Sequence, residues 1–239
     1  MKIAHVTATF PPYWAGTGNV VAQTARTLAN RGHDVTVFTP RVADPIEPPD
    51  DWPFETRRLP APLRVGNAAW TPALARVLSG FDVIHLHYPY IGGAEWAARA
   101  AGRLQVPLVL TYHNRLVSGG PLRRAAFRAY SRLVEPHVLN AADIVIAVHE
   151  DYRRAWFAAR PRVRAVPHGI DAGVFRPQNR FQSRAMLGLG TEERVVLFVG
   201  ALDRAHRFKN VGGLLDALAR CALPLTAVLV GDGDLVPDL

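Results

Sequence analysis

The sequence has little cysteine and no long apolar run. Cys221 is the only cysteine among the 239 residues, so the chain cannot form an internal disulfide. It lies in the apolar helical pattern LLDALARCAL, which predicts a buried thiol and not a nucleophile. No apolar run reaches the length of a membrane span, and the start, MKIAHVTATF, lacks the apolar stretch and the cleavage site of a signal peptide. These absences favour a cytoplasmic protein.

Lysine is also scarce. It occurs only at Lys2 and Lys209, so arginine carries nearly all of the positive charge behind a net charge of +8. This excess favours a negatively charged partner: nucleic acid, an anionic membrane surface or a phosphate-rich small ligand. The sequence has no zinc-ligand spacing and no basic region followed by heptads, which makes nucleic acid the least favoured of the three.

Apolar runs alternate with amphipathic segments along most of the chain. The runs predict strands and the segments between them predict helices. The expected strands are 2–8, 34–39, 54–59, 82–87, 107–113 and 143–148. The expected helices are 18–31, 71–79, 94–103, 121–140 and 150–159. Continuous apolar strands separated by helices indicate a parallel sheet covered on both faces, so we expect a Rossmann-like, doubly wound α/β domain over residues 1–170.

A second alternation of strands and helices follows a break in the chain's organisation. The stretch PHGIDAGVFRPQNRF clusters Gly, Pro and Asn, which is typical of an interdomain connection, and we assign the connection to residues 171–190. From its second half onward, the sequence predicts a helix–strand–helix–strand order: 181–187, 194–200, 210–221 and 225–233. We expect residues 191–239 to begin a second Rossmann-like domain that is incomplete.

The turn between the first strand and the first helix, TFPPYWAGTGN, carries Gly16-Thr17-Gly18 where the helix begins. In an open parallel sheet, ligands bind beyond the carboxyl ends of the strands, and glycines at a helix N-terminus let a phosphate approach unpaired N–H groups. Alternatively, the glycines only permit a tight turn. The dinucleotide fingerprint is excluded because no third glycine follows. Tyr13 lies in the same turn, and its ring can line a sugar-binding site.

Eight segments, taken in order, resemble one family. They are FPPYWAGTGN, LANRGHDVTVFTP, DVIHLHYP, LVLTYHN, NAADIVIAV, PHGIDAGVFRP, VVLFVGALDRAHRFKN and VLVGDGDL. Together they resemble the retaining glycosyltransferases of family 4, whose GT-B fold places two Rossmann-like domains across a cleft. The resemblance implies transfer of a hexose from a nucleotide-diphosphate sugar to a hydroxyl acceptor, with retention at the anomeric carbon and with no metal or other cofactor.

The resemblance also implies roles for residues of the first domain. Gly16 and Thr17 match the loop that meets the donor diphosphate and the acceptor, with Gly18 beside them. His113, in TYHN, matches a histidine beside the transferred sugar and is the expected catalytic residue; the alternative is a capping or core histidine. His87 lies at a strand end, and we expect it to line the cleft together with Tyr13.

In the second domain, the resemblance assigns the donor phosphates to basic residues. Lys209, in RFKN, matches a lysine that holds these phosphates; the alternative is a solvated lysine at the start of a helix. Ala201 occupies the place of a second basic residue, so Arg204 or Arg207 is expected to supply that charge, and Arg204 is favoured. Two cations aimed at a departing diphosphate stabilise the leaving group.

The paired glutamates that hold the donor sugar in this family belong to a later region than the last residue of this chain. We therefore expect little or no transferase activity from the chain alone. It can be a fragment of a longer product, a degenerate copy or one part of a split enzyme. A non-catalytic or partner-dependent subunit is the alternative function, and a nucleotide-sugar epimerase fits the motifs less well.

The predicted helix 121–140 is basic. Its segment LRRAAFRAYSRLV interleaves arginine with apolar residues, as a helix at an anionic membrane does. This pattern suggests a lipid-linked sugar or an inositol lipid as the acceptor, with peripheral contact at the inner face of the membrane. The favoured interpretation is the ordinary one, a packed helix with a solvated basic face.

Overall fold

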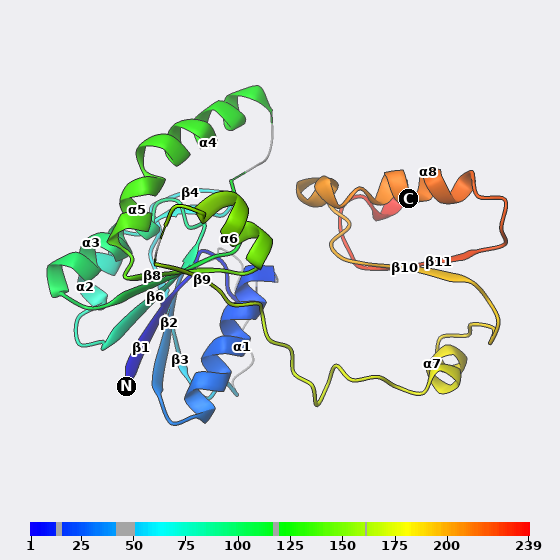
Figure 1. Ribbon diagram of the computed structural model, residues 1–239, viewed down its shortest axis with the longest axis horizontal. Helices are drawn as coiled ribbons and strands as arrows, with labels where there is room; N and C mark the ends of the chain where they lie inside the picture. Colours follow the sequence, from blue (N-terminus) through cyan, green and yellow to red (C-terminus); the bar gives the residue numbers. More distant parts are fainter. Residues whose placement is uncertain (13–15, 42–50, 117–119, 161) are drawn as a thin grey trace. The chain divides into compact units, whose positions relative to one another are not determined.

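A computed structural model describes residues 1–12, 16–41, 51–116, 120–160 and 162–239, so Tyr13 lies outside the described residues. The chain divides into two compact units (Figure 1). Unit 1 comprises Met1–Gly169 and unit 2 comprises Ile170–Leu239.

Unit 1 is built on a seven-stranded sheet in the order β3-β2-β1-β6-β7-β8-β9 (Figure 1). Every neighbouring pair in it is parallel, which confirms the predicted parallel sheet. The strands are β1 (Lys2–Val6), β2 (Asp34–Pro40), β3 (Glu55–Leu59), β6 (Val83–Tyr88), β7 (Leu108–Tyr112), β8 (Ile144–Ala147) and β9 (Val163–Ala165). The order runs outward from β1 in both directions, as in doubly wound sheets.

Side chains alternate along the strands and form a separate core on each face of the sheet. Ala4 and Val6 of β1 belong to the larger core, which includes much of β6 and β7. Ile3 belongs to a smaller core with Val21 and Ala25 of helix α1 (Gly16–Asn30). His5 therefore shares the face of Ile3, the face that α1 covers.

The predicted helix 121–140 is two helices in the structure. The helices of unit 1 after α1 are α2 (Leu74–Val77), α3 (Ala94–Leu104), α4 (Pro121–Leu133), α5 (Glu135–Ala141) and α6 (Glu150–Phe157). Pro136 lies in the first turn of α5, where its missing N–H is tolerated, but it cannot continue α4. Within the described ranges, no helix combines the length and the apolar character needed to cross a membrane.

A short hairpin precedes α2 that the sequence pattern does not predict. Strands β4 (Leu63–Val65) and β5 (Ala68–Trp70) pair antiparallel, and Gly66 in the turn between them has a φ of 59°. Glycine reaches this left-handed region at little cost. Strands of three residues are too short to give a clear alternation, and the predicted helix 71–79 shrinks to the single turn of α2.

Unit 2 contains a strand–helix–strand motif. Its elements are α7 (Arg180–Met186), β10 (Val195–Val199), the 3-10 helix η1 (Arg204–Lys209), α8 (Val211–Ala219), β11 (Thr226–Val230) and the short 3-10 helix η2 (Val236–Asp238). Strands β10 and β11 pair in parallel, as expected for a βαβ unit. Cys221 is exposed, so the expectation of a buried thiol is wrong; α8 ends at Ala219, before the cysteine.

Candidate active site

The loops that follow the strands of unit 1 meet at one edge of the sheet, because all seven strands run in the same direction. The turn before Gly16 follows β1, Tyr90 follows β6, His113 follows β7 and His168 follows β9. Residues far apart in the sequence thus share this carboxyl edge, and it is the candidate active site of unit 1.

The two glycines of the Gly16-Thr17-Gly18 turn have different roles. A Cβ atom at Gly18 would lie 3.0 Å from the Thr9 carbonyl oxygen and 3.1 Å from the Phe10 Cα, so Gly18 lets α1 pack against the turn. A Cβ atom at Gly16 would meet no atom of the described residues within 4 Å. Gly16 is exposed at the first position of α1, where the N–H groups have no partner within the helix. Gly18 supports the tight-turn explanation, and Gly16 supports the ligand explanation.

Arg58 of β3 anchors the same turn, and the sequence analysis missed it. Its Nη2 donates a hydrogen bond to the Pro11 carbonyl oxygen at 2.6 Å. Partial burial lowers the pKa of Arg58, but a guanidinium stays charged at neutral pH. The pairing of β3 with β2 brings this cation to the turn, and sequence pattern alone does not define that register.

His113 is the outer member of a hydrogen-bonded line of imidazoles. Its Nε2 lies 3.0 Å from Nδ1 of His87, and Nε2 of His87 lies 2.9 Å from Nδ1 of His5. We call the five residues His5, His85, His87, His113 and His168 the histidine row. The sequence analysis did not assign a role to His5, because its position beside His85 depends on the register of β1 against β6.

Ring stacking completes the histidine row. The ring centroids of His85 and His87 are 4.3 Å apart, and those of His113 and His168 are 5.1 Å apart. His85 is also fixed by Thr111, with 2.7 Å between Nε2 and Oγ1. His87 is 1% exposed, so the structure places it one ring behind His113, in the interior.

Burial keeps the histidine row uncharged. It is the main cause that lowers the pKa of every member, and nearby imidazoles add to the effect for His5, His87 and His113. The pKa falls to about 4 for His85 and to about 3 for His113. At neutral pH, His113 therefore acts as a neutral ring that donates or accepts a hydrogen bond, and not as an imidazolium acid.

Three members of the row are also the described residues that could hold a metal ion. The nitrogen atoms that His5, His85 and His87 offer lie within 4.8 Å of one another. Their rings, however, are inclined to each other by only 24–41°. A metal ion lies near the plane of each imidazole that binds it, and the His87 ring is stacked on both other rings at 24° and 27°, which disfavours a common binding point. The arrangement suits hydrogen bonding better than metal binding.

Unit 2 has its own candidate site, at the end of β10. A Cβ atom at Gly200 would lie 2.6 Å from Nζ of Lys209, so the lysine amine lies directly over this glycine. Arg204 is held elsewhere in the same loop: its backbone N–H donates to Oδ1 of Asp234 at 2.9 Å, and its Nε lies 3.5 Å from Oδ2. Of the two predicted phosphate-binding residues, Lys209 has the better placement, because a carboxylate already pairs with Arg204.

Backbone contact between the two strand ends shapes the loop around Lys209. A Cβ atom at Gly231, which follows β11, would overlap the Gly200 carbonyl oxygen, and one at Gly233 would overlap the Leu202 carbonyl. The stretch Gly231-Asp232-Gly233 is therefore required for packing against the loop after β10.

Sequence comparisons place these features in a known context. The family described as Glycosyltransferase Family 4 matches residues 14–174. A D-inositol 3-phosphate glycosyltransferase of Acidothermus cellulolyticus is 37% identical over 224 residues, which cover 79% of this chain and 47% of the relative. The enzyme of the same name from Mycolicibacterium smegmatis is 34% identical over 246 residues, covering 92% and 54%. The chain thus spans about half the length of the curated relatives it matches.

Solved structures share the fold at low sequence identity. Sucrose-phosphate synthase from Thermosynechococcus elongatus matches with a TM-score of 0.67 and 21% identity, over 96% of this chain and 70% of that chain. Anabaena HepE in complex with UDP and glucose matches with a TM-score of 0.63 and 20% identity, over 98% and 61%. These likenesses confirm the expected fold class.

Proposed function

The chain belongs to glycosyltransferase family 4, and we propose that it transfers a hexose from a nucleotide-diphosphate sugar to a hydroxyl group with retention of the anomeric configuration. The observation that carries the proposal is the position of His113. It is a neutral imidazole at the carboxyl edge of the sheet, with Nε2 hydrogen-bonded to Nδ1 of His87 and with Nδ1 lacking a hydrogen-bond partner among the described residues. The UDP bound to HepE, which shares the fold, supports the donor class.

The anomeric configuration is retained because the acceptor attacks the anomeric carbon from the same face that the leaving group departs from. The acceptor oxygen bonds to the anomeric carbon while the bond to the diphosphate oxygen breaks, and the diphosphate keeps that electron pair. The departing phosphate takes the acceptor proton, so no protein nucleophile is needed. His113 of unit 1 donates a hydrogen bond that orients the sugar. Lys209 is proposed separately, as the cation of a phosphate site within unit 2.

We propose an acceptor that itself carries phosphate, such as an inositol phosphate. The curated relatives are named for D-inositol 3-phosphate. The N-terminus of α1 at the exposed Gly16 and the cation of Arg58 give the unit 1 turn a positive character, which suits a phosphate group. A lipid-linked sugar or an inositol lipid carries the same phosphate chemistry.

The alternative is a partner-dependent or non-catalytic subunit, with little activity in the chain alone. In this alternative, the carboxyl edge of unit 1 still binds a ligand, and a second protein supplies the remaining groups.

Replacing His113 with Ala tests the proposed function. We expect kcat/KM for transfer from a UDP-hexose to an inositol phosphate to fall about tenfold, because a hydrogen bond to the sugar is lost. Product formation and anomeric configuration are measured by proton NMR. His137→Ala, at an exposed position on α5, is the matched control and should leave the rate unchanged.

Three results of this assay separate the alternatives. A product of inverted configuration contradicts the retaining mechanism. An unchanged rate in His113→Ala contradicts the role of His113. Transfer that occurs only when a second protein is added supports the partner-dependent subunit.

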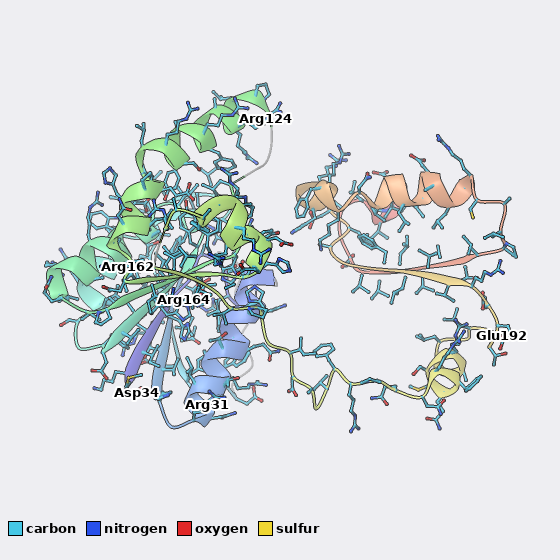
Figure 2. The ribbon with its side chains drawn as sticks, in the orientation of Figure 1. Arg31, Asp34, Arg124, Arg162, Arg164 and Glu192 are labelled. Atoms are coloured by element: carbon cyan, nitrogen blue, oxygen red, sulfur yellow. The ribbon has the colours of Figure 1, made fainter. Side chains whose placement is uncertain are left out.

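We also propose that α4 contacts an anionic membrane surface, which would place the protein at the inner face of the cytoplasmic membrane. The helix buries none of its residues. It carries exposed arginines at 123, 124, 128 and 132, and Leu122 and Leu133 are 85% and 69% exposed. Figure 2 shows the side chain of Arg124 near the end of α4, on the opposite side of unit 1 from Arg31. Arginine beside exposed leucine is typical of a helix at a lipid surface.

Charge reversal of Arg123 and Arg124 to Glu is expected to abolish flotation with vesicles that contain anionic lipid. Each arginine near such a surface contributes about 1 kcal/mol, so the double reversal removes most of the attraction. The matched control is reversal of Arg31 and Arg41, which are also exposed. Equal flotation of both double variants, or none with the unaltered chain, contradicts the membrane proposal.

A further inference from the structure

The hydrogen bonds of the histidine row restrict the tautomers of its members. Each nitrogen-to-nitrogen contact holds one hydrogen, and a neutral imidazole has only one N–H. His5, His87 and His113 are neutral, because burial lowers the pKa of all three. With contacts of 2.9 Å and 3.0 Å to satisfy, only two arrangements of the three hydrogens are consistent.

The two arrangements differ at both ends of the line. In the first, the hydrogens lie on Nε2 of all three rings, so His113 donates inward and its Nδ1 is a bare acceptor. In the second, the hydrogens lie on Nδ1 of all three rings, so His5 donates to His87 and His87 donates to His113. His113 then presents an Nδ1–H donor at the end of the line, on the nitrogen that does not face His87.

The inner end of the line distinguishes between them. Nε2 of His5 is buried and has no hydrogen-bond partner among the described residues. In the first arrangement this atom is an N–H donor without an acceptor, which is rare in protein interiors. In the second arrangement it is a lone pair, and every N–H of the two contacts has an acceptor.

We propose that His5 and His87 are positioning residues that hold His113 in the tautomer with Nδ1 protonated, so that the carboxyl edge offers one fixed hydrogen-bond donor to a ligand oxygen. Two hydrogen bonds carry this effect: one joins His5 of β1 to His87 of β6, and the other joins His87 to His113, the residue after β7. The use of this donor on a sugar hydroxyl rests on the proposed transferase function, whereas the tautomer itself does not.

The experiment is long-range proton–nitrogen correlation NMR on the whole chain labelled with ¹⁵N-histidine, at neutral pH. This spectrum separates the two neutral tautomers and the protonated form of each ring. Signals are assigned by single substitutions, including His137→Leu, which removes an exposed ring outside the row. We expect His5, His87 and His113 in the Nδ1–H form, and an unchanged row in His137→Leu.

Two variants of His87 test the transmission. His87→Asn keeps an N–H at the place of Nδ1, so His113 should stay in the Nδ1–H form. His87→Leu removes the donor, and the ratio of the two tautomers of His113 should shift about tenfold towards the Nε2–H form, the effect of one hydrogen bond. His5→Asn and His5→Leu form a second matched pair. The tautomer of His87, the next ring, should stay unchanged in His5→Asn and shift towards the Nε2–H form in His5→Leu.

Some results would overturn the proposal. A His113 ring in the Nε2–H form in the unaltered chain reverses the direction of the line, and this spectrum requires no folded variant. If the tautomer of His113 is unchanged in both leucine variants, while circular dichroism shows that the chain is still folded, then His5 and His87 do not control that tautomer. About one equivalent of zinc in the purified chain, with His5, His85 and His87 shifted on its removal, makes the row a metal site. An inactive chain with the expected tautomers contradicts only the transferase function.

Discussion

Replacing Lys209 with Met is expected to weaken the binding of UDP by about ten- to a hundredfold, the effect of losing a charged hydrogen bond to phosphate. The lysine amine lies over Gly200 at the end of β10, where the glycine has no side chain to separate it from the backbone. A diphosphate that approaches this strand end meets the amine at once. Arg204 cannot replace it without giving up Asp234, to which both its backbone and its side chain are bound.

The chain provides its own control for this prediction, because Lys2 is the only other lysine. Lys2→Met, in β1 of unit 1, should leave UDP affinity unchanged when both variants are measured by isothermal titration calorimetry. Lys209→Arg should recover part of the affinity, since it restores the charge with a longer and flatter head group. Equal affinities of Lys209→Met and the unaltered chain, or no UDP binding by the unaltered chain, would contradict a phosphate site at Gly200.

The parallel sheet of unit 1 could be predicted from the sequence because burial on both faces leaves a strong signal. The run DVTVFT of β2 is apolar or hydroxyl-bearing after its first residue, and the structure buries all but that first residue of the strand. The hairpin of β4 and β5 left no comparable signal, because its three-residue strands are partly exposed. The break between α4 and α5 is caused by Pro136, and a prediction based on apolar periodicity does not take this proline into account.

The candidate site could be predicted only in part, because it depends on register. His113 follows a strand end in the sequence, so its place at the carboxyl edge follows from the sheet alone. His5 becomes a neighbour of His85 only through the alignment of β1 with β6, and a shift by one residue would point it to the other face. Arg58 reaches the turn before Gly16 in the same way, through the alignment of β3 with β2.

Replacing Gly18 with Val is expected to destabilise unit 1 by about 3 kcal/mol, the cost of forcing side-chain atoms into packed backbone. A Cβ atom there would already lie 3.0 Å from the Thr9 carbonyl oxygen and 3.1 Å from the Phe10 Cα. Neither contact is the end of a flexible side chain, so the start of α1 must move away from the turn. The result would be a lower unfolding midpoint in urea, with the slope of the transition unchanged.

Tryptophan fluorescence measures this change in unit 1 alone, because all five tryptophans precede residue 170. Gly16→Val is the matched control, two positions away in the same helix, where a Cβ atom meets none of the residues that the structure describes within 4 Å. Its free energy of unfolding should change by less than about 0.5 kcal/mol, as at other exposed surface positions, while its affinity for inositol phosphate falls. Equal destabilisation by the two substitutions would contradict the separate roles of the glycines, and so would a stable Gly18→Val. The opposite pattern of stability and affinity in the two variants would show that one glycine packs the helix and the other admits the ligand.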